Sequence, residues 1–111
     1  MTLSKEDIKK MLTDEGWTLR KTGFEWTTSS KDSKHNIVFG FNYKTTPTTE
    51  NTIGLKSEEL EEFKWFYIAV EGEYHHIISR VDFTVDQVSE IVISKDSVFV
   101  MYPSYRSAWF G

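Results

Sequence analysis

The chain has 111 residues, a formal net charge of −4 and no cysteine. This is the usual length of a single domain, and 39% hydrophobic with 27% charged residues argues against wholesale disorder. The missing cysteines exclude disulfides, thiol catalysis and cysteine-ligated metal centres. The acidic balance disfavours direct binding to nucleic acid and to anionic membranes, because both attract clustered Lys and Arg.

No export or membrane segment is predicted. Residues 1–7 contain no apolar stretch, and the longest apolar run, residues 65–70, is far shorter than the ~20 residues of a membrane helix. We therefore expect a cytoplasmic protein with a single domain over residues 1–111.

Residues 4–15 are expected to form the main helix. Ser4 suits the N-cap position, and Asp7 places a negative charge in the first turn. Gly16 suits the left-handed position that follows a helix. A helix with so few apolar contacts is marginal alone, so we expect it to lie on a sheet. Its apolar stripe has i, i+3, i+4 spacing and consists of Ile8, Met11 and Leu12.

The first strands are expected immediately after this helix. Residues 17–19 and 24–28 flank a plausible hairpin turn at residues 21–23. Residues 37–43 alternate between two faces of a strand. Residues 44–54 show no period and contain several threonines and a proline, so we expect a long exposed loop.

A second short helix is expected near residues 57–62, because Ser57 can cap it and acidic residues follow at once. A solvated helix face is the simpler interpretation of these acids, and an acidic docking patch is the alternative. The acidic side chains are Glu58, Glu59, Glu61 and Glu62.

Residues 63–102 organise the rest of the chain. Their apolar runs are short, rich in β-branched and aromatic residues and bounded by turns, which is typical of successive antiparallel strands. Residues 84–87 fit either one helical turn or a tight connection between strands. The predicted fold is therefore of the α+β class, with the N-terminal helix packed on a curved, mainly antiparallel sheet of about five to seven strands.

Two of these strands are apolar on both faces. In residues 63–70 and 98–102, large apolar side chains alternate onto opposite sides, so each strand needs cover on both. One short helix covers only part of one face. The other face requires sheet curvature, the C-terminal tail or a partner. In that tail, Trp109 and Phe110 are expected to fold back on their own sheet rather than dock into another protomer.

An aromatic patch on this sheet is the main candidate binding site. If residues 71–72 form a two-residue turn, position 69 faces position 74, and position 67 faces position 76. A bulge at Gly72 would break this register, and the same residues can also serve as core. The predicted patch consists of Trp65, Tyr67, Tyr74 and His76.

No catalytic, cofactor or metal site is predicted. His75 and His76 point to opposite faces of a regular strand, so they cannot hold one ion together. The sequence contains neither a glycine-rich phosphate loop nor a nucleophile-elbow motif. Arg80 and Asp82 project to one side of a strand and are expected to form an ion pair.

The sequence favours a small acidic interaction protein of the inhibitor, immunity or adaptor type, from a bacterium or phage. Such a protein acts by occupying the surface of a protein partner, and the acidic balance favours a basic partner. Two alternatives stay open. One is a small-molecule binder or small enzyme with a pocket at the aromatic patch, and the other is a structural subunit that forms a homodimer through its sheet face.

Overall fold

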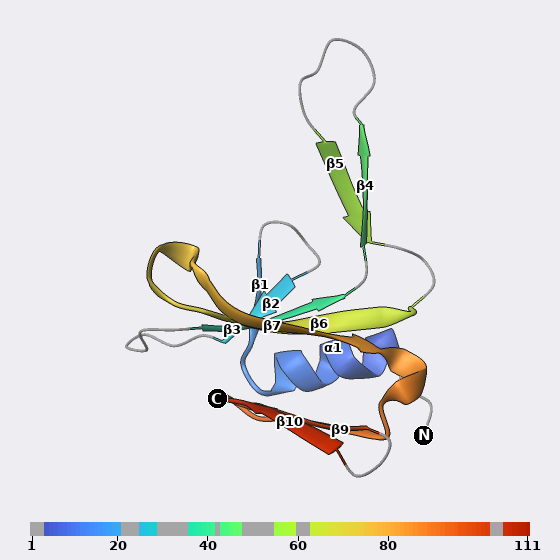
Figure 1. The fold of residues 1–111 in the computed structure, drawn as a ribbon, viewed down its shortest axis with the longest axis vertical. Coiled ribbons are helices and arrows are strands. Elements are labelled where there is room, and N and C mark those ends of the chain that lie inside the picture. Colours follow the sequence, from blue (N-terminus) through green and yellow to red (C-terminus); the bar gives the residue numbers. More distant parts are fainter. Residues whose placement is uncertain are drawn as a thin grey trace.

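The α+β class, with an N-terminal helix and antiparallel sheets, is confirmed by the structure, a computed structural model (Figure 1). The strands are divided between a larger and a smaller sheet rather than joined in one. Residues 43–47 and 55–59 are described by their backbone alone. The structure describes residues 4–20, 25–28, 36–41, 43–47, 55–59, 63–102 and 106–111.

The helix α1 spans Lys5–Asp14, close to its predicted bounds. The Ser4 side chain caps it by accepting a hydrogen bond from the Asp7 backbone N–H at 3.0 Å. Gly16 has a φ of 87°, the left-handed conformation expected of a glycine after a helix. The buried residues of the helix are Ile8 and Leu12.

The larger sheet has five antiparallel strands in the order β1-β2-β3-β6-β7. On alternate positions its strands bury large apolar side chains against α1, as the period of two requires. The side of this sheet that packs on α1 is called its inner face, and the opposite side its outer face. The strands are β1 Thr18–Leu19, β2 Glu25–Thr27, β3 Asn36–Phe41, β6 Trp65–Glu71 and β7 Ile77–Thr84.

The smaller sheet has three antiparallel strands in the order β10-β9-β8. A 3-10 turn at Val85–Gln87 joins it to β7, so the connection is a helical turn rather than a direct strand-to-strand turn. Ser94 and Ser97 close the turn between β8 and β9 through a backbone hydrogen bond of 2.8 Å. The strands are β8 Glu90–Ile93, β9 Val98–Tyr102 and β10 Arg106–Phe110.

The larger cluster of buried apolar residues that the structure describes lies between the two sheets, with α1 between them in Figure 1. A smaller cluster, Val38, Tyr67 and Ala69, lies on the outer face of the larger sheet. The Phe39 and Phe66 rings stack at 5.1 Å on the larger sheet, and Phe83 meets Phe110 of the smaller sheet edge-on at 6.3 Å. Trp17 links the layers, because its indole N–H donates to the Ser94 carbonyl at 2.8 Å.

Two predictions about the middle of the chain are wrong. The strand β4, Tyr43–Pro47, occupies part of the expected loop at 44–54 and pairs with β5, Leu55–Glu59, where a helix was expected near 57–62. Threonine is β-branched and favours strands, and a helix of six residues is too short to be stable without strong packing. Residues 48–54 and 60–62 lie outside the described part of the chain.

Candidate functional site

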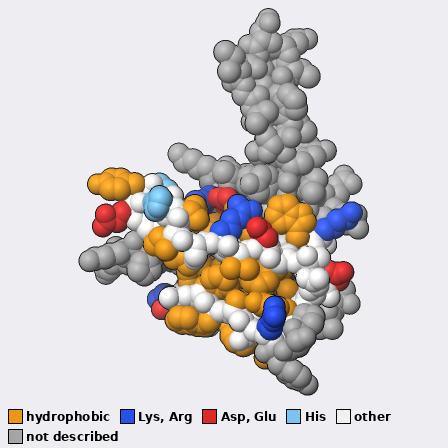
Figure 2. Space-filling view, in the orientation of Figure 1, with side chains coloured by type: hydrophobic (Ala, Val, Ile, Leu, Met, Phe, Trp, Pro, Cys, Tyr) orange, Lys and Arg blue, Asp and Glu red, His pale blue; other side chains and the backbone are white. Residues whose placement is uncertain are grey.

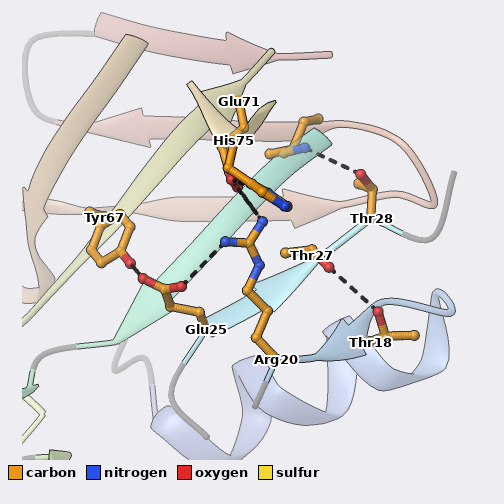
Figure 3. A network of polar contacts seen from close by, with 9 residues as sticks. Thr18, Arg20, Glu25, Thr27, Thr28, Tyr67, Glu71 and His75 are labelled. Carbon is orange, nitrogen blue, oxygen red and sulfur yellow. Dashed lines mark hydrogen bonds and ion pairs between the residues drawn. The ribbon is translucent and has the colours of Figure 1, made fainter. Parts of the chain in front are cut away.

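A chain of polar contacts crosses the outer face of the five-stranded sheet (Figure 3). The Tyr67 hydroxyl donates to the Glu25 carboxylate, and Glu25 lies 3.6 Å from the Arg20 guanidinium. Arg20 donates to both oxygens of Glu71, with 2.8 Å to Oε2. His75 Nδ1 lies 3.6 Å from the same Glu71 oxygen. The chain of contacts thus joins the end of β1, β2, β6 and the β6–β7 connection.

The sheet register explains why these side chains meet. Gly40 of β3 lies between Glu25 of β2 and Tyr67 of β6 in the pairing of the three strands. Because Gly40 has no side chain, the Tyr67 ring crosses β3 and reaches Glu25. The Arg20 N–H continues the β1–β2 ladder by donating to the Glu25 carbonyl at 2.9 Å, which places its side chain on the same face.

This network is accounted for by the fold. The Glu71 side chain is only 2% exposed, and a buried carboxylate without a partner would strongly destabilise the folded state. Arg20 supplies that partner and also lies beside Glu25, so both carboxylates are engaged within the sheet. No bound ligand is needed to explain these charges.

The predicted Arg80–Asp82 ion pair is confirmed. The Arg80 guanidinium lies 3.0 Å from Asp82 Oδ1 and 3.9 Å from the centre of the Tyr67 ring. A cation over an aromatic face is attracted by the ring's negative potential. Alternation along β7 puts both charged residues on the outer face of the sheet.

The predicted register of the aromatic patch is wrong. The structure pairs Tyr67 with Asp82 rather than with His76. The connection from β6 to β7 is not a two-residue turn, because it contains a 3-10 turn at Glu73–His75 closed by a 2.7 Å bond from the Gly72 N–H to the His76 carbonyl. A bulge next to Glu71 shifts the pairing further, which is the kind of slip that a single extra residue produces.

Only two of the four predicted patch residues therefore share a surface. Trp65 and Tyr67 lie on the outer face, where Tyr67 is buried and Trp65 half-buried. Tyr74 and His76 lie in the connection, and Tyr74 is 97% exposed. The hollow lined by residues 72–78 contains Tyr74 and His76 but neither Trp65 nor Tyr67. In the part of the chain that the structure describes, this hollow thus brings together two of the four predicted residues and not all four.

The three-stranded sheet carries a second surface, on the side turned away from the core. In β8, Ile91 and Ile93 are buried while Val92 is exposed, so Val92 points outward. Directly paired residues share a face, and the register places Val92 beside Phe99 and Phe99 beside Trp109. These three residues and Met101 form what we call the apolar face, which consists of Val92, Phe99, Met101 and Trp109.

The two residues singled out in the C-terminal tail, Trp109 and Phe110, lie on opposite sides of the smaller sheet. Strand β10 pairs with β9, so the tail folds back on its own sheet as expected. Phe110 is buried against Phe83, whereas Trp109 is 66% exposed. The sequence showed that residues 98–102 are apolar on both sides. Which side the core covers depends on the packing of the two sheets. The sequence therefore did not identify Val92 as a surface residue of this face.

The remaining site predictions are only partly placed. Glu58 and Glu59 lie on the strand β5 rather than on a helix, and Glu61 and Glu62 lie outside the described residues, so the acidic patch stays a prediction. Within the described ranges, no three His, Asp or Glu residues are grouped so that they could hold a metal ion. No helix in that part of the chain is long and apolar enough to span a membrane.

Comparisons with protein-family models, with curated proteins and with solved structures found no match to this chain. The function must therefore be argued from the geometry of its surfaces.

Proposed function

We propose that this chain is a small protein-binding domain that acts by covering part of a partner's surface with its apolar face. The observation that carries this proposal is the exposure of Trp109, 66%, in one cross-strand row with Phe99 and Val92. Contiguous exposed apolar surface with a polar border is typical of protein interaction sites. Tryptophan is among the residues most enriched at the energetic centres of such interfaces.

The fold does not require Trp109 at this position. Phe110 already anchors β10 in the core, and a smaller or polar residue at position 109 would preserve the backbone pairing with β9. A fully buried large apolar side chain stabilises by about 1.5–3 kcal/mol relative to an exposed one. A partner that covers the apolar face would gain much of this free energy on binding. Figure 2 shows apolar side chains at the lower border of the molecule, where the three-stranded sheet lies in Figure 1.

The charge of the chain favours a partner whose binding site has a basic border. The net charge is −4, and the exposed Glu90 is paired directly with Met101 at the edge of the apolar face. Opposite charge around an apolar centre speeds association and excludes partners with the wrong charge. An inhibitor, immunity protein or adaptor works by this kind of surface occupation.

The experiment compares capture of partners by the immobilised wild-type chain and by two matched variants, Trp109→Ala and Leu19→Ala. Both residues are exposed, and Leu19, 48% exposed, lies on β1 of the other sheet. We expect Trp109→Ala to weaken the affinity for a captured protein at least about tenfold, as loss of a central anchor does. Leu19→Ala should retain it. Both variants should keep the wild-type melting temperature.

Equal capture by Trp109→Ala and the wild type would show that the apolar face is not part of the binding interface. A binding rate that does not fall as the salt concentration rises would contradict the proposed basic partner, because attraction between exposed charges is screened by salt.

A further inference from the structure

Among the strands that the structure describes, β7 forms one edge of the five-stranded sheet, with β6 beside it on one side only. It has eight residues, whereas β1 at the opposite edge has two. Natural sheets usually protect an edge by making it short, by a bulge, or by placing proline or charged residues, lysine above all, on it. β7 is long and contains neither lysine nor proline, and its two charged residues, Arg80 and Asp82, have opposite signs. Seven of its residues are exposed, and no described strand pairs with this edge.

The direction of the backbone groups on β7 follows from one hydrogen bond. The Val85 N–H donates to the Lys64 carbonyl at 3.0 Å and continues the β6–β7 ladder beyond Thr84. In an antiparallel pair, alternate residues turn their N–H and C=O groups toward the neighbouring strand. Phe83, Val81 and Ser79 therefore bond to β6. The intervening residues direct their N–H and C=O groups to the outer edge, and they are Thr84, Asp82 and Arg80.

We propose that two copies of this chain pair through these edges to form a two-fold dimer centred on Val81. A two-fold axis perpendicular to the sheet keeps the inner faces of both copies on one side. It also pairs residues that project to the same face, so an outer-face residue lies opposite an outer-face residue of the other copy. The backbone groups of Arg80 and Asp82 would then bond to those of the second copy.

The charges of Arg80 and Asp82 favour a second copy of this chain as the partner at the β7 edge, and they favour one register of pairing. With Val81 opposite the partner's Val81, each Arg80 lies opposite the partner's Asp82, and each Asp82 opposite the partner's Arg80. Moving the axis by one residue instead sets Arg80 against the partner's Arg80, or Asp82 against the partner's Asp82. Opposite charges across a strand pair are stabilising and like charges are destabilising. Only the Val81-centred register sets opposite charges against each other at all four positions, in addition to the Arg80–Asp82 pair within each copy. A second copy of the chain supplies this pattern of charges.

Apolar contact supports the same centre. Val81 is 37% exposed although it lies on the inner face, opposite Ile68 of β6. In the dimer, Val81 would face the partner's Val81 in a pair without hydrogen bonds, where side chains approach most closely. Figure 2 shows apolar side chains gathered between β7 and the three-stranded sheet, with oppositely charged side chains beside them. The dimer would shield part of this apolar surface.

The test measures the mass of the full chain by sedimentation equilibrium for the wild type, Arg80→Asp, Asp82→Arg, and an equimolar mixture of the two variants. The wild type should be dimeric. In the homodimer of either variant, like charges lie opposite each other at two places. The dissociation constant of that homodimer should therefore rise at least about tenfold. In the mixture, the Arg80→Asp chain carries only acids at the two positions and the Asp82→Arg chain only arginines. These chains should form a heterodimer with each other.

A fold defect in the variants cannot produce this pattern, because two misfolded chains would not restore the dimer on mixing. A wild-type chain that stays monomeric at about 100 µM overturns the proposal. A dimer that is as stable in both single variants as in the wild type also overturns it, since its interface must lie elsewhere.

Hydrogen exchange of the wild type gives a second measurement that needs no variant. Amide protons of Arg80 and Asp82 should exchange more slowly at concentrations where the dimer forms, because the dimer adds hydrogen bonds from them to the second copy. The Val81 amide bonds to β6 in both states, so it serves as the internal reference. Unchanged exchange at Arg80 and Asp82 in a dimeric sample would also overturn the proposal. Both readouts are independent of the apolar face, so the proposed function and the dimer can fail separately.

Discussion

The aromatic ring of Tyr67 lies directly over Gly40 of the neighbouring strand. A β-carbon at position 40 would overlap the ring at Cε1 and Cζ. This close approach lets the Tyr67 hydroxyl reach Glu25 on β2, beyond the strand that separates them. The polar network on the outer face of the sheet thus depends on the absence of one side chain.

Gly40→Ala should therefore destabilise the protein by about 1–3 kcal/mol, the usual result of forcing an extra carbon into a packed site. The measurement is the free energy of unfolding in urea. In a Tyr67→Ala background the ring is gone, and the same substitution should have little effect. An equal loss of stability in both backgrounds would mean that Gly40 is needed for some reason other than the ring.

Glu71→Gln should lower the free energy of unfolding by about 1–3 kcal/mol, because Arg20 loses a charged partner at a site closed to water. The matched control is Asp14→Asn, which breaks the exposed Lys10–Asp14 pair of α1, with 3.7 Å between the charged atoms. An exposed pair contributes little, so the control should change stability by less than about 0.5 kcal/mol. Similar losses in both variants would contradict the structural role given to Glu71.

Phe110→Ala should lower the stability of the fold strongly, whereas Trp109→Ala should hardly change it. The Phe110 ring is buried against Phe83, so its removal should lower the free energy of unfolding by about 3 kcal/mol. Trp109 is mostly exposed, so Trp109→Ala should change stability by less than about 0.5 kcal/mol. Thermal unfolding of both variants checks this contrast. A large loss at position 109 would show that its side chain belongs to the core rather than to a binding surface.

Tyr74 has a φ of 57° and a ψ of 30°, in the left-handed region that residues with a side chain seldom occupy. Tyr74→Gly should relieve this strain and raise the free energy of unfolding by about 0.5–1 kcal/mol. Tyr74→Ala keeps a β-carbon and should not stabilise. Chemical denaturation of the two variants separates the backbone effect from loss of the exposed ring, and equal stabilities would argue against strain at this residue.

Local signals in the sequence were sufficient for the elements that depend on local chemistry. Ser4 caps α1 and Gly16 follows it because capping and left-handed geometry involve neighbouring residues only. The Arg80–Asp82 pair follows from alternation along one strand. Elsewhere, local signals were misleading: residues 57–62 carry a plausible helix cap, yet the strand Leu55–Glu59 pairs with Tyr43–Pro47. Pairing with the preceding strand stabilised this backbone more than one short helix could.

The aromatic patch shows the same limit at the level of a site. Alternation placed Trp65 and Tyr67 on one face, but the partner of Tyr67 depended on a single bulge and on the turn at Glu73–His75. By itself, the sequence determined that both faces of the strand at residues 98–102 are apolar. Only the packing of the two sheets decided that Val98 and Val100 are buried and that Phe99 and Met101 remain partly exposed, because side-chain period specifies two faces and not which one the core covers.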